Sequence, residues 1–392
     1  MKFIRPIILL CLIALLSACG DEDNSEPPAL LTSFTRTADL DQQWSAITGD
    51  EIGQQFLFIQ PLLLDDLIVV AGRNGVLTIF DTEHGYELAE INLDEELSGG
   101  IGGNSSKVLV TTRDGSVVCI DLGDKTVSWK TRVPSEVLSR PVLYNNIVLV
   151  RTGDGRLLGL DLGTGKIKWS YAQTIPALTL RGSSSPVIAR GRVFVGLDNG
   201  RMIALSPIDG EVIWDIALTV PQGRSEIQRL VDIDGRSELY GRLLYATSFQ
   251  GRMAAIDVST GQFVWSRPFS SHSGLTVDKD AVYSSDDMSY VWALDRNTGA
   301  TLWKQEKLKL REVTRPVLFG EYLVVGDYEG YLHVMSKFDG HFVARTQVSD
   351  SGLGSGILVP PVVQGERIFA LTRDGLLASY KLKQIVKEDL DF

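Results

Sequence analysis

The chain has 392 residues, of which 44% are hydrophobic and 22% are charged, and its formal net charge is −11. An acidic chain without a cluster of lysine and arginine is a poor binder of nucleic acid, so we expect no nucleic-acid partner.

Residues 1–18 predict a lipoprotein signal peptide. A basic start precedes the apolar run Ile7–Leu16, which is shorter than the roughly 20 residues that span a bilayer. Small residues followed by Cys19 resemble the lipobox of bacterial lipoproteins. That resemblance implies cleavage before Cys19 and its lipidation. Because Gly20 is not Asp, it also implies anchoring in the outer membrane, facing the periplasm. An ordinary signal peptide with an incidental cysteine is the alternative.

The rest of the chain divides into three parts. Residues 19–33 are polar, acidic and proline-containing, which predicts a flexible tether. We expect one domain built from repeats over residues 34–382, and a frayed tail over residues 383–392.

The stretch Arg151–Trp169 predicts three short strands joined by two tight turns. The apolar run Leu157–Leu160 is bounded by turn residues, which favours a buried strand over a helix. Gly155 and Gly165 can adopt the positive φ of tight turns. Asp161 can accept a hydrogen bond from the backbone two residues further on.

This unit repeats along the chain. The turn position of Gly155 recurs at Gly75, Gly115, Gly200, Gly251, Ser289, Gly330 and Gly375. Ten residues after each position come Gly85, Lys125, Gly165, Gly210, Gly261, Gly299 and Gly340 in the first seven units. Four residues later, these units have Ala89, Trp129, Trp169, Trp214, Trp265, Trp303 and Ala344. The internal offsets are constant while the spacing between units varies, so each unit is one structural block.

A period of about 43 residues with four short strands per unit predicts an all-β fold, an eight-bladed β-propeller with four antiparallel strands per blade. The last unit has only three strands, and Gln42–Ile47 can supply the fourth and close the ring. We expect the tryptophans to fill the wedge between neighbouring blades. A ligand-stacking surface is the alternative.

The common catalytic motifs are absent from the sequence. It has no Gly-x-Ser-x-Gly elbow, Walker loop or His-Glu-x-x-His, and its four histidines lack ligand spacing, so we expect no catalytic, metal or cofactor residue. The glycine-rich run Ser98–Gly103 precedes no helix pattern, which predicts a loop between blades. Cys119 stands alone in an apolar strand and is expected to be a buried, inert thiol.

The pattern Leu-Asp-x-x-Thr-Gly-x-x-x-Trp at Leu160–Trp169 and Leu294–Trp303 resembles the quinoprotein propeller repeat. This resemblance implies an alternative function, a dehydrogenase that uses pyrroloquinoline quinone (PQQ) and Ca²⁺. Many alcohol dehydrogenases of that group have a vicinal Cys-Cys pair that this sequence lacks, although sugar dehydrogenases can lack it too. Fold alone does not fix function.

Two inserts interrupt the repeat, and both fall between predicted blades: residues 174–182, the first insert, and residues 221–234, the second insert. Apolar residues and an arginine in the first, near acidic residues in the second, suit a contact with a partner protein. The alternative for the leucines is packing against the adjacent blade.

The inserts also carry the most specific resemblance. Leu-x-Leu-Arg-Gly at 178–182 and Ser-Glu-Ile-x-Arg-Leu-x-Asp-x-Asp at 225–234 resemble the BamB family of outer-membrane assembly factors. The resemblance implies a non-enzymatic lipoprotein that binds the POTRA domains of BamA, with nascent β-barrel proteins as further partners. Carried over by position, the BamA-binding residues are Leu178, Leu180, Arg181, Asp232 and Asp234.

Overall fold

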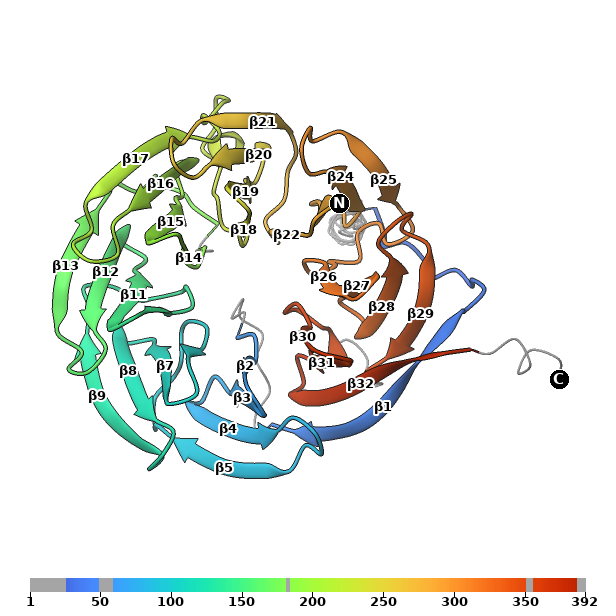
Figure 1. Ribbon diagram of the computed structural model, residues 1–392, viewed down its shortest axis with the longest axis horizontal. Coiled ribbons are helices and arrows are strands. Elements are labelled where there is room, and N and C mark those ends of the chain that lie inside the picture. The colour runs from blue at the N-terminus through green and yellow to red at the C-terminus, as the bar shows by residue number, and fades with distance from the viewer. Residues whose placement is uncertain (1–25, 49–58, 181–183, 350–354, 386–392) are drawn as a thin grey trace, which may run out of the picture.

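The computed structural model describes residues 26–48, 59–180, 184–349 and 355–385. Eight four-stranded antiparallel sheets stand in a ring around a central axis (Figure 1). The all-β, eight-bladed propeller expected from the sequence is confirmed. In each blade the first strand lies near the axis and the fourth lies at the rim.

The first four blades are formed by consecutive strands. Blade 1 contains β2 (Leu62–Leu64), β3 (Leu67–Ala71), β4 (Val76–Asp81) and β5 (Glu87–Asn92). Blade 2 contains β6 (Gly102–Gly103), β7 (Lys107–Thr112), β8 (Ser116–Asp121) and β9 (Thr126–Arg132). Blade 3 contains β10 (Val142–Tyr144), β11 (Ile147–Arg151), β12 (Arg156–Asp161) and β13 (Ile167–Ala172). Blade 4 contains β14 (Val187–Ala189), β15 (Arg192–Gly196), β16 (Arg201–Leu205) and β17 (Val212–Ala217).

The other four blades follow the same plan until the last. Blade 5 contains β18 (Glu238–Tyr240), β19 (Leu243–Thr247), β20 (Arg252–Asp257) and β21 (Phe263–Pro268). Blade 6 contains β22 (Leu275–Val277), β23 (Ala281–Ser285), β24 (Val291–Asp295) and β25 (Thr301–Gln305). Blade 7 contains β26 (Val317–Phe319), β27 (Tyr322–Gly326), β28 (Tyr331–Ser336) and β29 (Phe342–Gln347). Blade 8 contains β30 (Val362–Gln364), β31 (Arg367–Leu371), β32 (Leu376–Gln384) and β1 (Ala38–Ile47).

The hydrophobic core is divided among the eight interfaces between blades. The buried apolar residues form eight clusters, and each cluster joins two neighbouring blades. The residues of the second and third strands are almost all buried, as in β11. In a rim strand such as β13, most residues are exposed. A single four-stranded sheet cannot bury both of its faces, so each blade depends on its two neighbours.

The tryptophans fill the wedges between blades, as the sequence predicts. Trp169 of β13 lies over Gly210 of the next blade, where an added Cβ would be 2.5 Å from the indole Cε3. Its Nε1–H donates to the carbonyl of Pro207 at 3.0 Å. The same contact recurs with Trp44, Trp129, Trp214, Trp265 and Trp303 over Gly85, Gly165, Gly261, Gly299 and Gly340.

The N-terminal strand closes the ring, which confirms the prediction. β1 pairs antiparallel with β32 from Ala38 opposite Gln384 to Ile47 opposite Leu376. Trp44 then packs into the cluster that joins blade 8 to blade 1. Residues ahead of β1 also contact the ring, because Arg311, in the connection from blade 6 to blade 7, donates to the carbonyl of Ala29 at 3.1 Å and Phe34 packs against Phe342.

One expected loop ends in a short strand. Gly102 and Gly103, at the end of the glycine-rich run, form β6, the innermost strand of blade 2. A Cβ at Gly102 would be 2.0 Å from the carbonyl oxygen of Pro141, so glycine is needed where blades 2 and 3 approach each other near the axis. Cys119 is fully buried in β8, and burial raises the pKa of its thiol. Among the described residues, no helix has the length and apolar character needed to cross a membrane.

Candidate docking surface

The two inserts are successive connections between blades. The first insert runs from the rim strand β13 of blade 3 to the inner strand β14 of blade 4, and the second runs from β17 of blade 4 to β18 of blade 5. Each connection leads from a rim strand to an inner strand, so the inserts immediately precede and follow blade 4 in the chain. The repeat fixes their ends and leaves their middles free to differ.

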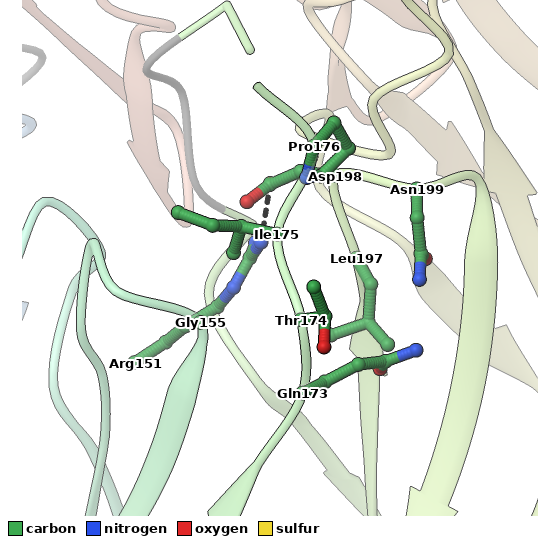
Figure 2. Close-up of a pocket in the computed structure, with 9 residues that line it drawn as sticks. All are labelled: Arg151, Gly155, Gln173, Thr174, Ile175, Pro176, Leu197, Asp198 and Asn199. Atoms are coloured by element: carbon green, nitrogen blue, oxygen red, sulfur yellow. Dashed lines mark hydrogen bonds and ion pairs between the residues drawn. The ribbon is translucent and has the colours of Figure 1, made fainter. Parts of the chain in front are cut away.

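The first insert is anchored where it leaves β13. The Gln173 N–H donates to the carbonyl of Gly155 at 3.2 Å, and the Ile175 side chain covers Gly155. Figure 2 shows Ile175 beside Gly155 and Arg151 at a cavity of about 10 Å³. That volume is at the lower limit for one water molecule, so this cavity cannot hold a small-molecule substrate.

The second insert has internal structure. A short 3₁₀ helix, η1 (Ile227–Arg229), forms its tip. The side-chain oxygen of Gln228 accepts a hydrogen bond from the Arg224 N–H at 2.9 Å, which closes the turn ahead of the helix. After the helix, Ile233 is fully buried between blades 4 and 5, against Gly196. The base of the insert is therefore fixed to the core.

A hydrogen bond joins the two inserts. The backbone N–H of Leu180 donates to the Asp232 carboxylate, with 2.5 Å between the nitrogen and Oδ2. Asp232 is 0% exposed, and its own carbonyl accepts from the Phe249 N–H of blade 5 at 2.9 Å. The inserts are thus side by side, and Asp232 supports the first insert from beneath instead of facing solvent.

Apolar side chains of both inserts reach solvent. In the first insert Leu178 is 40% exposed and Leu180 is 38% exposed. In the second insert Ile227 is 66% exposed, and Val220, just before it, is 61% exposed. Sequence reasoning did not assign Val220 or Ile227 to the site. The signal that identified the leucines, apolar residues in a predicted loop, was present for both.

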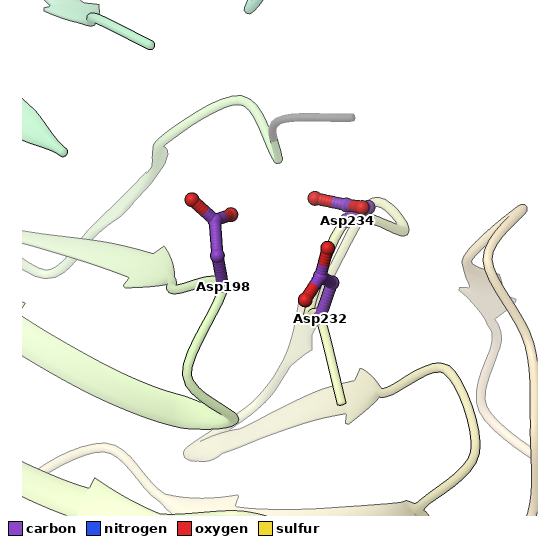
Figure 3. Close-up of side chains that lie close together, drawn as sticks. All are labelled: Asp198, Asp232 and Asp234. Carbon is purple, nitrogen blue, oxygen red and sulfur yellow. The ribbon is translucent and has the colours of Figure 1, made fainter. Parts of the chain in front are cut away.

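Beneath the inserts lies a group of three carboxylates, from Asp198, Asp232 and Asp234 (Figure 3). Asp198 follows β15 and is paired with Arg151, a buried side chain of blade 3. Both carboxylate oxygens of Asp234 are shielded from solvent and have no hydrogen-bond partner among the described residues. The same is true of Oδ1 of Asp232. Burial raises the pKa of Asp232 to about 6 and that of Asp234 to about 7.

Two of the predicted site residues, Arg181 and Cys19, lie outside the described residues. The remaining four come together: Leu178 and Leu180 on the surface, Asp232 directly under Leu180, and Asp234 in the acidic group with Asp232.

Comparison with known proteins identifies the family. A family profile described as "Outer membrane protein assembly factor BamB" matches residues 73–305 and 293–384. The assembly factor BamB of Kangiella koreensis is 37% identical over 373 residues, covering 95% of each chain. The crystal structure of BamB from Moraxella catarrhalis superposes with a TM-score of 0.79 at 28% identity, covering 87% of this chain and 99% of that one.

Proteins outside this family have the same propeller fold. The quinohemoprotein alcohol dehydrogenase from Comamonas testosteroni gives a TM-score of 0.70 at 13% identity, covering 88% of this chain and 76% of that one, which shows a common fold alone. The family profile and the relatives that match over nearly the full length decide the assignment: the chain belongs to the BamB family of outer membrane protein assembly factors.

Proposed function

We propose that this protein is a non-enzymatic scaffold of the β-barrel assembly machinery and that the two inserts dock on the POTRA domains of BamA. The observation that supports this proposal is the hydrogen bond from Leu180 to Asp232, which holds two non-repeat segments side by side with their apolar side chains exposed. A rigid apolar patch loses little conformational entropy on binding.

The predicted residues have different roles in this proposal. Leu178 and Leu180 anchor the partner through apolar contact, as do Val220 and Ile227. Arg181 supplies planar hydrogen bonding to a carboxylate or carbonyl of the partner. Asp232 positions the first insert by accepting a hydrogen bond from the Leu180 N–H. Asp234 contributes to the acidic group beneath that insert.

The described N-terminal segment contacts blades other than those that carry the inserts. We propose that Cys19 is lipidated and holds the protein at the periplasmic face of the outer membrane. Residues 26–34 pack where blades 6 and 7 meet: Lys309 pairs with Glu26 at 2.5 Å, and Arg345 donates to the carbonyl of Thr32 at 3.0 Å. Because the inserts flank blade 4, the lipid and the docking surface would leave the ring from different blades. In this arrangement the protein binds its partner through the inserts while the lipid on Cys19 stays in the bilayer.

The test is co-purification from solubilised membranes. The triple variant Leu178→Ala, Leu180→Ala, Arg181→Ala should lose most of the BamA that the unmodified protein retains. The control is Ile208→Ala with Phe338→Ala, which removes two apolar side chains that are 68% and 66% exposed, more than the leucines, from hairpin turns in blades 4 and 7. Unchanged BamA recovery with the triple variant, or equal loss with the control, would contradict the proposed surface.

A second measurement addresses catalysis. On the scaffold proposal, titration of the purified protein with PQQ and Ca²⁺ produces no bound chromophore and no dye-linked alcohol oxidation. Oxidation that depends on the added quinone would replace the scaffold with the dehydrogenase alternative.

A further inference from the structure

We propose that Asp198, Asp232 and Asp234 form a binding site for one divalent cation, with Ca²⁺ as the best fit, beneath the junction of the two inserts. This site is distinct from the docking of a partner, since it lies below the surface and is defined by the isolated chain. No histidine or cysteine contributes to it, so histidine and cysteine spacing in the sequence gives no hint of it.

The three carboxylates converge from two connections. Asp198 is placed by the turn between β15 and β16, and Asp232 and Asp234 come from the last residues of the second insert. One oxygen from each carboxylate lies within 4.8 Å of the others. Two oxygens that bind the same Ca²⁺ at about 2.4 Å can be separated by at most about 4.8 Å, so the carboxylates are close enough to share one ion. Figure 3 shows all three side chains directed toward one space.

The oxygens facing this space lack partners. Asp232 is 0% exposed, and its Oδ1 has no hydrogen-bond partner among the described residues. Both oxygens of Asp234 are likewise shielded and unpaired. A buried carboxylate oxygen without a hydrogen bond is costly, and a bound ion is one partner that would offset this cost.

The charge balance points to a cation with two charges. Arg151 contributes one positive charge through its pair with Asp198, and its side chain is 3% exposed. When all three carboxylates are ionised, they and the one guanidinium paired with them among the described residues leave two negative charges, which a divalent cation neutralises. Hard cations prefer carboxylate oxygens, and Ca²⁺ accepts the larger and less regular oxygen sets. Mg²⁺ usually keeps several waters and one or two carboxylates, which fits this set less well.

An ion here would couple three parts of the chain. It would join the hairpin turn of blade 4 to the end of the second insert, and through Asp232 Oδ2 it would fix the N–H of Leu180 in the first insert. The patch proposed for docking would therefore be held in one shape by the ion as well as by the protein core.

The experiment is calorimetric titration of the EDTA-treated mature protein with CaCl₂ at neutral pH. We expect one Ca²⁺ per chain, together with a rise in melting temperature. Asp234→Asn is the informative variant because the Asp234 oxygens have no described hydrogen bonds to lose, so the fold is preserved while one ligand charge is removed. It should weaken Ca²⁺ binding by at least about tenfold.

Glu83→Gln, which removes an exposed carboxylate from a turn of blade 1, is the matched control and should bind Ca²⁺ as the unmodified protein does. No saturable binding at millimolar Ca²⁺ would overturn the proposal and leave a shared proton as the occupant. Equal binding by Asp234→Asn would also overturn it. Neither result depends on BamA, so the site and the docking surface can fail separately.

Discussion

Single residues set the spacing of the ring, and the contact of tryptophan with glycine shows this most clearly. Wherever a blade presents a tryptophan at its rim, the following blade has a glycine beneath it. Blade 1 has Ala89 in place of tryptophan, and the next blade has Lys125 in place of glycine. Lys125 also has a positive φ, of 59°. The side chain is permitted there because no indole covers the position. The glycine is therefore needed for space as well as for its backbone conformation.

This distinction predicts unequal effects for two glycine substitutions. Gly210→Ala and Gly320→Ala both place a Cβ at positive φ, 75° and 58° respectively. At Gly320 nothing lies within 4 Å of the added atom, so only the backbone cost of about 1–2 kcal/mol is expected. At Gly210 the Cβ meets the indole of Trp169, which should add about 1–3 kcal/mol. Urea unfolding of both variants measures the difference, and equal midpoints would contradict the role of the indole.

Much of the fold could be predicted because its signals are local. The offsets between glycine and tryptophan lie inside one unit, so they indicated the blades, the wedge and the closing strand. The burial of Asp232 had no such signal, because its partner Leu180 is 52 residues away in the chain. The acidic group was hidden for the same reason: Asp198 and Asp234 meet only when blades 4 and 5 stack. The glycine-rich run predicted a loop because no helix pattern follows it, and its last two residues form β6 because crowding near the axis admits only glycine at Gly102.

Among the strands and their connections, blade 7 has the most unusual interior, a buried polar network. His333 of β28 is fully buried. Arg345 donates from Nε to its Nδ1 at 2.9 Å, so the ring proton must be on Nε2, facing Asp327 at 2.8 Å. Arg311 also binds Asp327, at 2.8 Å. Burial lowers the pKa of His333 below its ordinary value, against the attraction of Asp327, and the histidine is neutral in the folded blade.

The network predicts acid sensitivity in this blade. Since the folded pKa of His333 is below 6.5, the unfolded chain binds more protons than the native one as pH falls below 6.5. Its stabilising contribution is thus present above that pH and is lost as pH falls toward the folded pKa. The pKa of Asp327 is also lowered, but its contribution is lost only below its ordinary value of 3.8. Hydrogen exchange at about pH 7 and about pH 5, corrected for intrinsic rates, should show reduced protection of β28 at the lower pH.

The control is internal to that experiment. β8 in blade 2 occupies the same position as β28 but has no histidine. Its protection should change little over the same interval. An equal loss in both strands would mean that acid acts on the whole ring and not through His333.

At the scale of the whole molecule, the ring is stable only if it is closed. Every blade shares its core with two neighbours, and the interface between blades 8 and 1 depends on β1, which supplies Trp44 and pairs along β32. Removing β1 would leave β32 as an unpaired edge and would open that interface. An unpaired strand edge is a template for association with other chains.

Two truncations of the mature chain separate closure from the other contacts of the N-terminal segment. Deleting residues 20–47 removes β1 and should produce oligomers on gel filtration with a lower urea midpoint, because the loss of a buried tryptophan alone costs about 3–5 kcal/mol. Deleting residues 20–33 keeps β1 and removes only part of the segment that packs where blades 6 and 7 meet, so the protein should remain monomeric. If both truncations behave alike, the N-terminal strand is not what closes the ring, since the blades would then hold together without it.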